Sequence, residues 1–558
     1  MINLNNKTSQ SLNLKILISS LLFSLAVSII VFGSASLPGN DVFYHIRMAE
    51  IISSGNWAMT DFPWTTCSIW SHPFFNKEWL FHIYLIPFIL IFGNIAGAKV
   101  ATAVTAFLIA LAWGNLFKTL KVKNLIFAML FMLFCTGYIY IGRLVLCRSF
   151  LISILFMPLA LNCVFRRKRV LLVFILYLYM LAYVGAWQML PVIFIFDLFI
   201  FLEAYKKRAL SRTEDSKVLL KQLKDLMIPW AFAGVVAGIL ITPYFPINIK
   251  AIYTQTILIL KAQWFGVNEA GTLPMGTELA PIPLKHLICY IGIFSLFGFT
   301  LYDLFHRTLS KKRYSSAIPS LNKAEKSDSD LNKSNQFQPD EATPRIHALI
   351  LLTTIYLTLT LFTQKFVEYL VPLLTLTIFL YWEKYPLPAW NSTCPFYTPK
   401  GKDDYTLSTL RRKFVIALLI LAGIVSIFQI KESFYRKNLT YQDSSEWIKK
   451  NIPKGTLIFS GDWDDNVILF YYLTDYKFLV LLDPYFMYAE SPKKFILWEK
   501  IVSGKVEDAA GAIEEKFNTN VVFVPPDRQR LRHRLLMNDR SKLLYEGKSG
   551  ESIFLLKP

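Results

Sequence analysis

Two acidic residues near the start of the chain are the first candidates for chemistry. Asp41 precedes the sequence Val-Phe-Tyr-His45, and Glu78 precedes Trp79 at the start of the next apolar segment. A carboxylate held at a membrane surface can accept the proton of a hydroxyl group as that hydroxyl attacks an electrophilic carbon. We therefore interpret Asp41 and Glu78 as candidate catalytic residues. The alternative is that both are ordinary loop residues.

Basic residues that could bind a phosphate group lie elsewhere in the sequence. Arg143 and Arg148 flank a turn between two apolar segments, and guanidinium groups can bind phosphate bidentately. Lys365 lies in a very short turn between two other apolar segments, where a charge is costly and often functional. The two arginines could instead extend to the membrane surface. His45 would share a helical face with Asp41 and could orient its carboxylate or contact substrate, or simply form a local hydrogen bond.

The composition predicts which elements position these residues. The chain has 558 residues, of which 54% are hydrophobic and 18% are charged, and its mean hydropathy is +0.41. Apolar runs of membrane-spanning length recur along it, which predicts an α-helical polytopic membrane protein with about 11 to 13 transmembrane helices. The first run is longer than the apolar part of a signal peptide, so we expect it to be retained. The runs are 14–34, 79–93, 98–117, 124–141, 145–164, 169–184, 187–203, 229–247, 284–305, 346–362, 366–381 and 412–430.

The positions of Lys and Arg predict the orientation of the chain. These residues form clusters between apolar runs, and such clusters collect on the cytoplasmic side of a membrane. The segments without such clusters are then expected on the outer side: the first loop (35–78), the turn 142–148, the loops 248–283 and 363–365, and the tail from residue 432. Loop 248–283 is long enough to close over a bound lipid as a lid. All the candidate residues named above then lie at the outer side.

The sequence divides into a transmembrane domain, 1–431, and an extracytoplasmic α/β domain, 432–558. Within the first, the polar stretch 308–344 is expected to be a disordered cytoplasmic loop because it has few apolar residues. The tail has short strand patterns that alternate with helical ones, which favours a small, independently folding α/β domain. The expected strands are 456–460, 477–481, 521–524, 542–546 and 552–556, and the expected helices are 465–473, 493–502 and 507–517.

The order of these features resembles the GT-C superfamily of polyprenyl-phosphate-dependent glycosyltransferases. Members include aminoarabinose transferases, protein O-mannosyltransferases and the catalytic subunits of oligosaccharyltransferases. The residues that carry the resemblance are Asp41 in its Asp-x-x-x-His setting and Glu78 before Trp79, in the loop after the first span. The resemblance implies that Asp41 is catalytic and that Glu78 is a second acid of the same loop. It also implies a polyprenyl-phosphate sugar donor.

One segment of the tail is similar in position to the acceptor motif of oligosaccharyltransferases. It reads Ser460-Gly-Asp-Trp463-Asp464-Asp, whereas the family motif is Trp-Trp-Asp-Tyr-Gly. The second aromatic residue and the glycine are missing, so we do not expect recognition of a sequon. Trp463 and Asp464 remain candidate substrate-binding residues, and the simpler alternative is that Asp462 or Asp464 caps a helix.

The expected function is therefore that of an integral membrane glycosyltransferase acting on an extracytoplasmic glycan, lipid or protein. In a single displacement, Asp41 would deprotonate the acceptor, while Lys365, Arg148 and Arg143 would stabilise the departing phosphate. An acid pair near a phosphate favours Mg²⁺ or Mn²⁺, and metal dependence is left open. The expected location is a bacterial inner membrane, crossed several times, with the C-terminal domain outside.

Other classes of protein are weighed against this interpretation. A transporter or flippase of lipid-linked substrates would carry ionisable residues near the middle of the membrane, and Asp197 alone answers to that description. A non-catalytic scaffold that displays the α/β domain would leave Asp41 and Glu78 pointing apart. The net charge of +20 does not indicate nucleic-acid binding, because the basic residues sit between apolar runs and face membrane lipids. The six cysteines show no spacing typical of disulfides or metal ligands.

Overall fold

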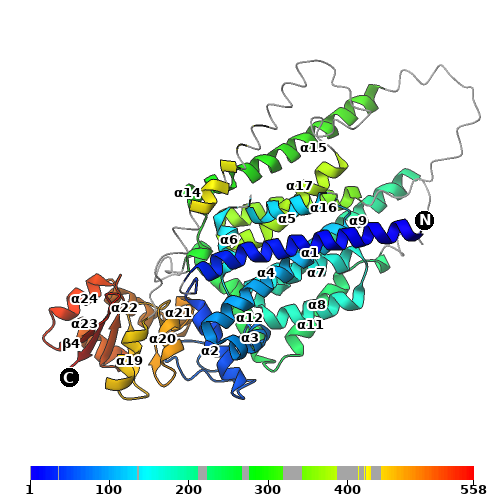
Figure 1. The fold of residues 1–558 in the computed structure, drawn as a ribbon. Coiled ribbons are helices and arrows are strands. Elements are labelled where there is room, and N and C mark those ends of the chain that lie inside the picture. Colours follow the sequence, from blue (N-terminus) through cyan, green and yellow to red (C-terminus); the bar gives the residue numbers. More distant parts are fainter. Residues whose placement is uncertain are drawn as a thin grey trace, which may run out of the picture.

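The computed structural model shows a long helical bundle with a smaller sheet domain at one end (Figure 1). It describes residues 2–34, 37–122, 124–134, 137–211, 223–266, 276–317, 342–385, a few residues between 413 and 428, and 441–557. Residues 318–341 of the predicted disordered loop and 432–440 of the predicted tail lie outside the described residues.

The bundle is built from helices of very different lengths. The first part of the chain forms α1 (Ile2–Gly33), α2 (Asp41–Ser53), α3 (Trp79–Phe92), α4 (Asn94–Thr119), α5 (Leu125–Phe134), α6 (Tyr138–Val145), α7 (Phe150–Phe165), α8 (Arg169–Ala182), η1 (Val184–Gln188) and α9 (Met189–Ser211). The second part forms α11 (Ile228–Leu240), α12 (Ile247–Tyr253), η2 (Thr254–Leu258), α13 (Ile259–Phe265), η3 (Thr277–Leu279), α14 (Leu284–Leu287), η4 (Ile288–Tyr290), α15 (Ile291–Ala317), α16 (Ala342–Phe362), η6 (Gln364–Phe366) and α17 (Val367–Lys384).

The bundle is a membrane-spanning one by length and composition. Among the described residues, five helices are long and apolar enough to cross a membrane, or six if the bent pair α6–α7 counts as one span. The two helices of this pair meet at 101°. Three shorter apolar helices, α3, α8 and α11, accompany them. The polytopic helical fold is thus confirmed, while the number of 11 to 13 crossings stays a prediction.

Small residues allow the helices to pack closely. A Cβ atom added to Gly114 of α4 would lie 2.8 Å from the Ile16 side chain of α1, and the Ser24 hydroxyl donates a hydrogen bond to the Ala103 carbonyl across the same contact. A Cβ added to Gly234 of α11 would lie 2.7 Å from the Val173 carbonyl oxygen of α8. Close approach of this kind is typical of helices packed within a membrane.

Some predicted segments differ in the structure. The predicted run 124–141 is divided into α5 and α6, and Gly137 precedes α6 with a positive φ of 84°. The predicted outer loop 248–283 contains the helical elements α12, η2, α13 and η3. The predicted disordered loop 308–344 is helical at both ends, because α15 continues to Ala317 and α16 begins at Ala342. Lys and Arg, which are frequent in 308–317, are good helix formers.

The sheet domain is an α/β fold, as expected. Its five strands lie in the order β2-β1-β3-β5-β4. Strand β1 is parallel to β2 and β3, whereas β5 is antiparallel to β3 and β4. The strand expected at 477–481 is shorter than predicted, and α21 and α24 were not predicted. The elements are α19 (Gln442–Asn451), β1 (Leu457–Ser460), α20 (Asn466–Tyr472), β2 (Lys477–Phe478), α21 (Pro484–Glu490), α22 (Pro492–Val502), α23 (Ala509–Phe517), β3 (Val521–Val524), α24 (Gln529–Leu536), β4 (Ser541–Glu546) and β5 (Ser552–Leu556).

The sheet domain is joined to the first outer loop by backbone hydrogen bonds. The Phe478 amide donates to the Trp64 carbonyl at 2.8 Å, and the Thr66 amide donates to the Phe478 carbonyl at 2.9 Å. Helix α20 packs against α2, where Phe470 contacts the rings of Tyr44 and Trp64. The first loop therefore extends the edge of the sheet next to β2. These contacts hold the sheet domain against the ends of the helices.

Candidate active site

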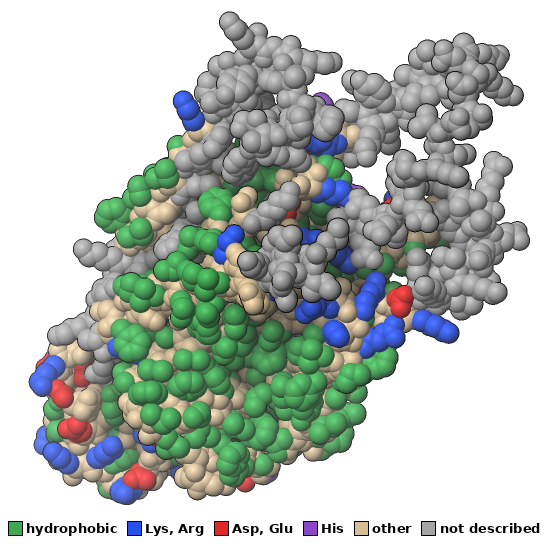
Figure 2. Space-filling model, turned by 45° about the vertical axis from the view of Figure 1, so that its right-hand side comes forward, with side chains coloured by type: hydrophobic (Ala, Val, Ile, Leu, Met, Phe, Trp, Pro, Cys, Tyr) green, Lys and Arg blue, Asp and Glu red, His purple; other side chains and the backbone are tan. Residues whose placement is uncertain are grey.

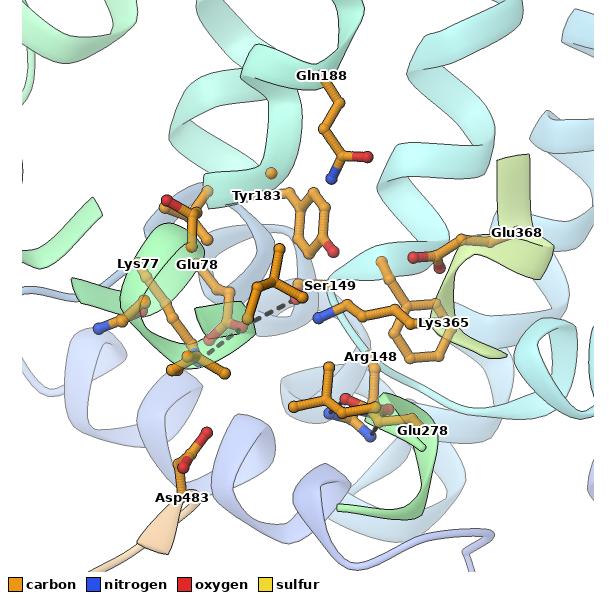
Figure 3. A pocket seen from close by; sticks show the side chains of 18 of the residues that line it. Lys77, Glu78, Arg148, Ser149, Tyr183, Gln188, Glu278, Lys365, Glu368 and Asp483 are labelled. Atoms are coloured by element: carbon orange, nitrogen blue, oxygen red, sulfur yellow. Dashed lines mark hydrogen bonds and ion pairs between the residues drawn. The ribbon is translucent and has the colours of Figure 1, made fainter. Parts of the chain in front are cut away.

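A cavity lies where the ends of the helices meet the sheet domain (Figure 3). The volume of the cavity is about 140 Å³, enough for a phosphate group or several ordered waters. Elements far apart in the sequence form its walls, including the start of α2, the α6–α7 turn, η2 with α13, η3, η6 and the loop before α21. Its acidic and basic lining residues are Asp41, His45, Lys77, Glu78, Arg148, Glu278, Lys365, Glu368 and Asp483.

Asp41 is the first residue of α2 and faces Arg148 across the cavity. One Arg148 Nη lies 2.5 Å from the Asp41 carboxylate. Burial raises the pKa of the Asp41 carboxyl, and the neighbouring Arg148 guanidinium opposes that rise. The position at a helix N-terminus also favours the carboxylate form. Asp41 is therefore a carboxylate with a higher proton affinity than an exposed one, as a general base requires.

Arg148 is shared between two carboxylates. Besides Asp41, it contacts Glu278 at 3.1 Å, and Arg143 donates to the same Glu278 oxygen at 2.7 Å. Burial acts to raise the pKa of Glu278, yet Arg148 and Arg143 together hold that pKa well below its ordinary value. The break between α6 and α7 allows this arrangement, because it brings both arginines to one turn at the end of the bundle. Glu278 was predicted only as part of a lid, so its role in orienting Arg148 was missed.

Glu78 caps the start of α3 on the same side of the cavity. Its Oε1 accepts a hydrogen bond from the Ser149 hydroxyl at 3.0 Å and lies 3.9 Å from the Lys77 ammonium. Its Oε2 is buried and has no hydrogen-bond partner among the described residues. Asp41 and Glu78 both line this cavity.

His45 also lines the cavity but does not orient Asp41. Its Nδ1 lies 2.9 Å from Nε2 of His82, on α3, so the two imidazoles share a hydrogen bond. Asp41 and His45 lie one turn apart on α2, but the hydrogen bond of His45 is made to His82 on α3. His82 was not predicted as a site residue, although it lies one helical turn after Glu78.

Lys365 and Glu368 come from the junction of η6 and α17. Figure 3 shows the Lys365 side chain extending into the cavity near Arg148 and Glu278. Within the part of the chain that the structure describes, no carboxylate lies within ion-pairing distance of the Lys365 ammonium. Arg143 does not line the cavity, although it lies 3.6 Å from the cavity-lining residue Glu368. The structure thus brings Lys365 and Arg148 to the cavity of Asp41, while Arg143 supports Glu278.

The sheet domain contributes two acidic groups to this region. Asn40, next to Asp41, donates a hydrogen bond to Asp464 at 2.8 Å, and burial followed by the charge of Asp41 raises the pKa of Asp464 to about 8. Asp483 lines the cavity, and burial raises its pKa to about 6, although its carboxylate accepts from the Tyr485 amide. Asp483 was not predicted as a site residue.

The alternative reading of Asp462 or Asp464 as a helix cap is wrong. The residue before α20 is Asp465, and its side chain makes no capping hydrogen bond. Asp462 instead accepts from the Asp464 amide at 2.8 Å, which shapes the turn that carries Asp464 towards Asp41. Trp463 is half-buried and does not line the cavity. Only Asp464 of this pair is placed near the other candidate residues.

The fold is similar to that of solved membrane proteins, although the sequence has no significant match. No protein-family model matches the sequence, and no curated protein matches it significantly. The structure is similar to archaeal oligosaccharyltransferase AglB from Archaeoglobus fulgidus in complex with an inhibitory peptide and a dolichol-phosphate, with a TM-score of 0.59 and 12% identity over 97% of this chain and 74% of that chain. The chain is similar in overall fold to this structure.

Other solved structures accompany this match. The same Archaeoglobus fulgidus oligosaccharyltransferase, tethered to an acceptor peptide containing the NVT sequon, gives a TM-score of 0.58 at 12% identity, over 98% of this chain and 74% of that chain. ArnT from Cupriavidus metallidurans bound to undecaprenyl phosphate gives a TM-score of 0.46 at 12% identity, over 96% of this chain and 97% of that chain. The oligosaccharyltransferase fold confirms the architecture implied by the GT-C resemblance.

Proposed function

We propose that the chain is an integral membrane glycosyltransferase that transfers a sugar from a polyprenyl-phosphate-linked donor to an extracytoplasmic acceptor. The observation that carries the proposal is the cavity itself, in which a half-buried carboxylate, Asp41, lies among the cations Lys77, Arg148 and Lys365. Transfer from a lipid phosphate needs a base for the acceptor and cations for the leaving group. The oligosaccharyltransferase fold supports the same conclusion.

The cations suit a phosphate leaving group. The leaving phosphate is already a stable anion, so the site needs to stabilise its charge more than to protonate it. Arg148 is held in place by Asp41 and Glu278, whereas Lys365 extends into the cavity with no carboxylate within ion-pairing distance among the described residues. Lys365 is therefore the cation most available to a donor phosphate, and Arg148 keeps N–H groups in a fixed orientation beside it.

The lipid part of the donor has an apolar path to the cavity. Gln255, Thr256, Ile259 and Leu260 of η2 and α13 line the cavity. Other side chains of the same helical stretch are apolar and exposed on the outside of the bundle: Ile249, Tyr253, Ile257, Trp264 and Phe265. A polyprenyl chain lying along this surface would keep its apolar carbons in the membrane while its phosphate entered the cavity.

The acceptor would approach from the side of the sheet domain. AglB was solved with peptides, one of them carrying an NVT sequon, but Trp463 of this chain does not line the cavity and the rest of the acceptor motif is missing. Asp464 and Asp483 make this side acidic. The acceptor is therefore a glycan, a lipid or a protein. Recognition of a sequon peptide is not favoured, because the acceptor motif is incomplete.

The distribution of charge supports an outer location for the cavity. Figure 2 shows a broad hydrophobic surface between the sheet domain and an opposite end where Lys and Arg gather. At that opposite end, Lys118 of α4 contacts Asn13 of α1, and Thr119 contacts Asn162 of α7. Because basic residues collect on the cytoplasmic side, the sheet domain and the cavity would lie outside. A bacterial inner membrane is the location that we propose.

The two competing classes fit less well. A transporter would use Asp197, but this carboxylate accepts hydrogen bonds of 2.7 Å from the amides of Met227 and Ile228 at the start of α11. It thus has a structural role. A scaffold would leave Asp41 and Glu78 apart, whereas both line one cavity.

The proposal can be tested without knowing the sugar. Membranes of cells with and without the chain would be analysed by mass spectrometry for glycans on surface lipids, polymers and proteins. Loss of one glycan on deletion, and its return with the wild-type chain but not with Asp41→Asn, is the expected result. Unchanged surface glycans, together with altered transport of a lipid-linked sugar, would favour the transporter.

A further inference from the structure

Two histidines and a glutamate meet at the wall of the cavity, between α2 and α3. Nitrogen atoms of His45 and His82 and a carboxylate oxygen of Glu78 all lie within 4.8 Å of one another. The three residues are 3%, 0% and 7% exposed, respectively. Side chains that are both polar and buried to this degree normally have all their hydrogen-bonding atoms paired.

Two of these three side chains, Glu78 and His82, are incompletely paired. Oε2 of Glu78 and Nδ1 of His82 are buried and have no hydrogen-bond partner among the described residues. The hydrogen bond between the two imidazoles uses Nδ1 of His45 and Nε2 of His82. The second nitrogen of each ring takes no part in it. A buried carboxylate oxygen without a partner is costly unless a cation or a donor occupies the adjacent space.

The backbone holds the three groups in place. His82 lies one turn after Glu78, since its amide bonds to the Glu78 carbonyl at 3.0 Å, so both side chains point to the same side of α3. His45 is presented from α2, which packs against α3. The ligand atoms thus come from two packed helices, a rigid setting of the kind that metal sites need.

We propose that His45, Glu78 and His82 bind a divalent transition-metal ion of the Zn²⁺ class. Two imidazoles and one carboxylate are a donor set that suits Zn²⁺, whereas Mg²⁺ and Mn²⁺ prefer oxygen ligands. The ion would replace the proton that the two rings share. Tetrahedral Zn²⁺ holds two nitrogens about 3.3 Å apart, so the rings, now 2.9 Å apart, would separate by about 0.4 Å.

The site would keep one coordination position open to the cavity. His45 and Glu78 line the cavity, while His82 lies behind them. Three protein ligands with one open position are typical of catalytic zinc sites, and of sites that bind an oxygen of a substrate. Lys77, 3.9 Å from Glu78, and Arg148, which lines the same cavity, weaken cation binding, and the charge of Glu78 offsets this in part. The inference goes beyond the proposed glycosyl transfer and does not depend on it.

Metal content of the purified full chain tests this site directly. The protein would be prepared in lipid nanodiscs without a polyhistidine tag, stripped with a chelator and dialysed against Zn²⁺. We expect about one retained equivalent in the wild type, and less than about a tenth of that in His45→Gln and His82→Gln. His72→Asn, a change at an exposed histidine outside the cluster, serves as the matched control and should retain the ion.

A second measurement guards against variants that fail to fold. Co²⁺ bound to the stripped wild type should give the visible absorption of a low-symmetry site, and an about hundredfold excess of Mg²⁺ should not displace it. A wild type that retains no Zn²⁺, displacement by Mg²⁺, or retention by folded His82→Gln protein would overturn the proposal. Because no donor or acceptor is present, this outcome is independent of whether the chain transfers a sugar.

Discussion

Asp41 and Glu78 differ in their neighbours, and this difference separates their expected roles. Asp41 contacts Arg148 and lies beside the open cavity, whereas Glu78 is bound by Ser149. Asp41→Asn keeps the shape and removes the base, so transfer should fall by roughly 10²-fold or more while expression is retained. Glu78→Gln should reduce transfer less. Both are measured as initial rates with a polyprenyl-phosphate sugar, and near-normal transfer by Asp41→Asn would refute the mechanism.

Lys365 should contribute to donor binding more than to the fold. Lys365→Met preserves the length of the side chain but removes the charge that extends into the cavity. A charge-assisted hydrogen bond to phosphate is worth about 1.5 to 3 kcal/mol, so the Kd of the donor should rise by roughly 10- to 100-fold. Lys454→Met, at an exposed ion pair with Asp475, is the control and should leave the Kd unchanged. Equal Kd values for both variants would remove Lys365 from the site.

Asp464 should make the stability of the protein depend on pH. Its pKa is raised from 3.8 to about 8 in the folded state, mainly by burial and then by Asp41. Between these values the folded chain holds a proton that the unfolded chain has lost, so the free energy of unfolding falls as pH rises from about 4 to about 8. Asp464→Asn removes this dependence, and its gain in Tm over the wild type should therefore be larger at about pH 9 than at about pH 5.

A neighbouring acid outside the cavity provides the comparison. Asp475→Asn, on the exposed surface of the sheet domain, should change the Tm similarly at both pH values. If Asp464→Asn and the wild type lost stability in parallel with rising pH, the carboxyl of Asp464 would not be the group that resists ionisation.

The contact between α2 and α20 is the element-level feature that holds the cavity together. Phe470 is fully buried and contacts Tyr44, Phe62 and Trp64 of the first loop. Phe470→Ala should reduce the free energy of unfolding of the sheet domain by about 3 to 5 kcal/mol, because it leaves a cavity among packed rings. Thermal unfolding and limited proteolysis would measure the change.

An exposed apolar residue of the same domain gives the control. Met537 lies at the end of α24 and is 72% exposed, so Met537→Ala should change stability by less than about 0.5 kcal/mol. Equal effects of the two substitutions would mean that the first loop and α20 are not packed as described.

The basic end opposite the sheet domain predicts the orientation of the whole molecule. Protease added to intact spheroplasts should remove the sheet domain, because the cavity end is predicted to face outward. A tag at the N-terminus should be cut only after the membrane is ruptured. Protection of the sheet domain in intact spheroplasts would invert the orientation, and the proposed extracytoplasmic reaction would fall with it.

Local signals in the sequence were sufficient for the architecture. The apolar runs predicted the helical bundle, because each span must be apolar over its whole length. Alternating short strands and helices after residue 441 predicted the α/β domain, since these patterns depend on neighbouring residues. Asp41 and Glu78 could be selected because both lie in one loop between two spans.

Contacts between distant segments were decided only by the tertiary structure. The pairing of Arg148 with both Asp41 and Glu278 depends on the 101° break between α6 and α7, which no periodic pattern reveals. The packing of α2 on α3 brings His45 within hydrogen-bonding distance of His82. Helix periodicity specifies which residues share a face, but the partner of that face depends on how the whole chain packs.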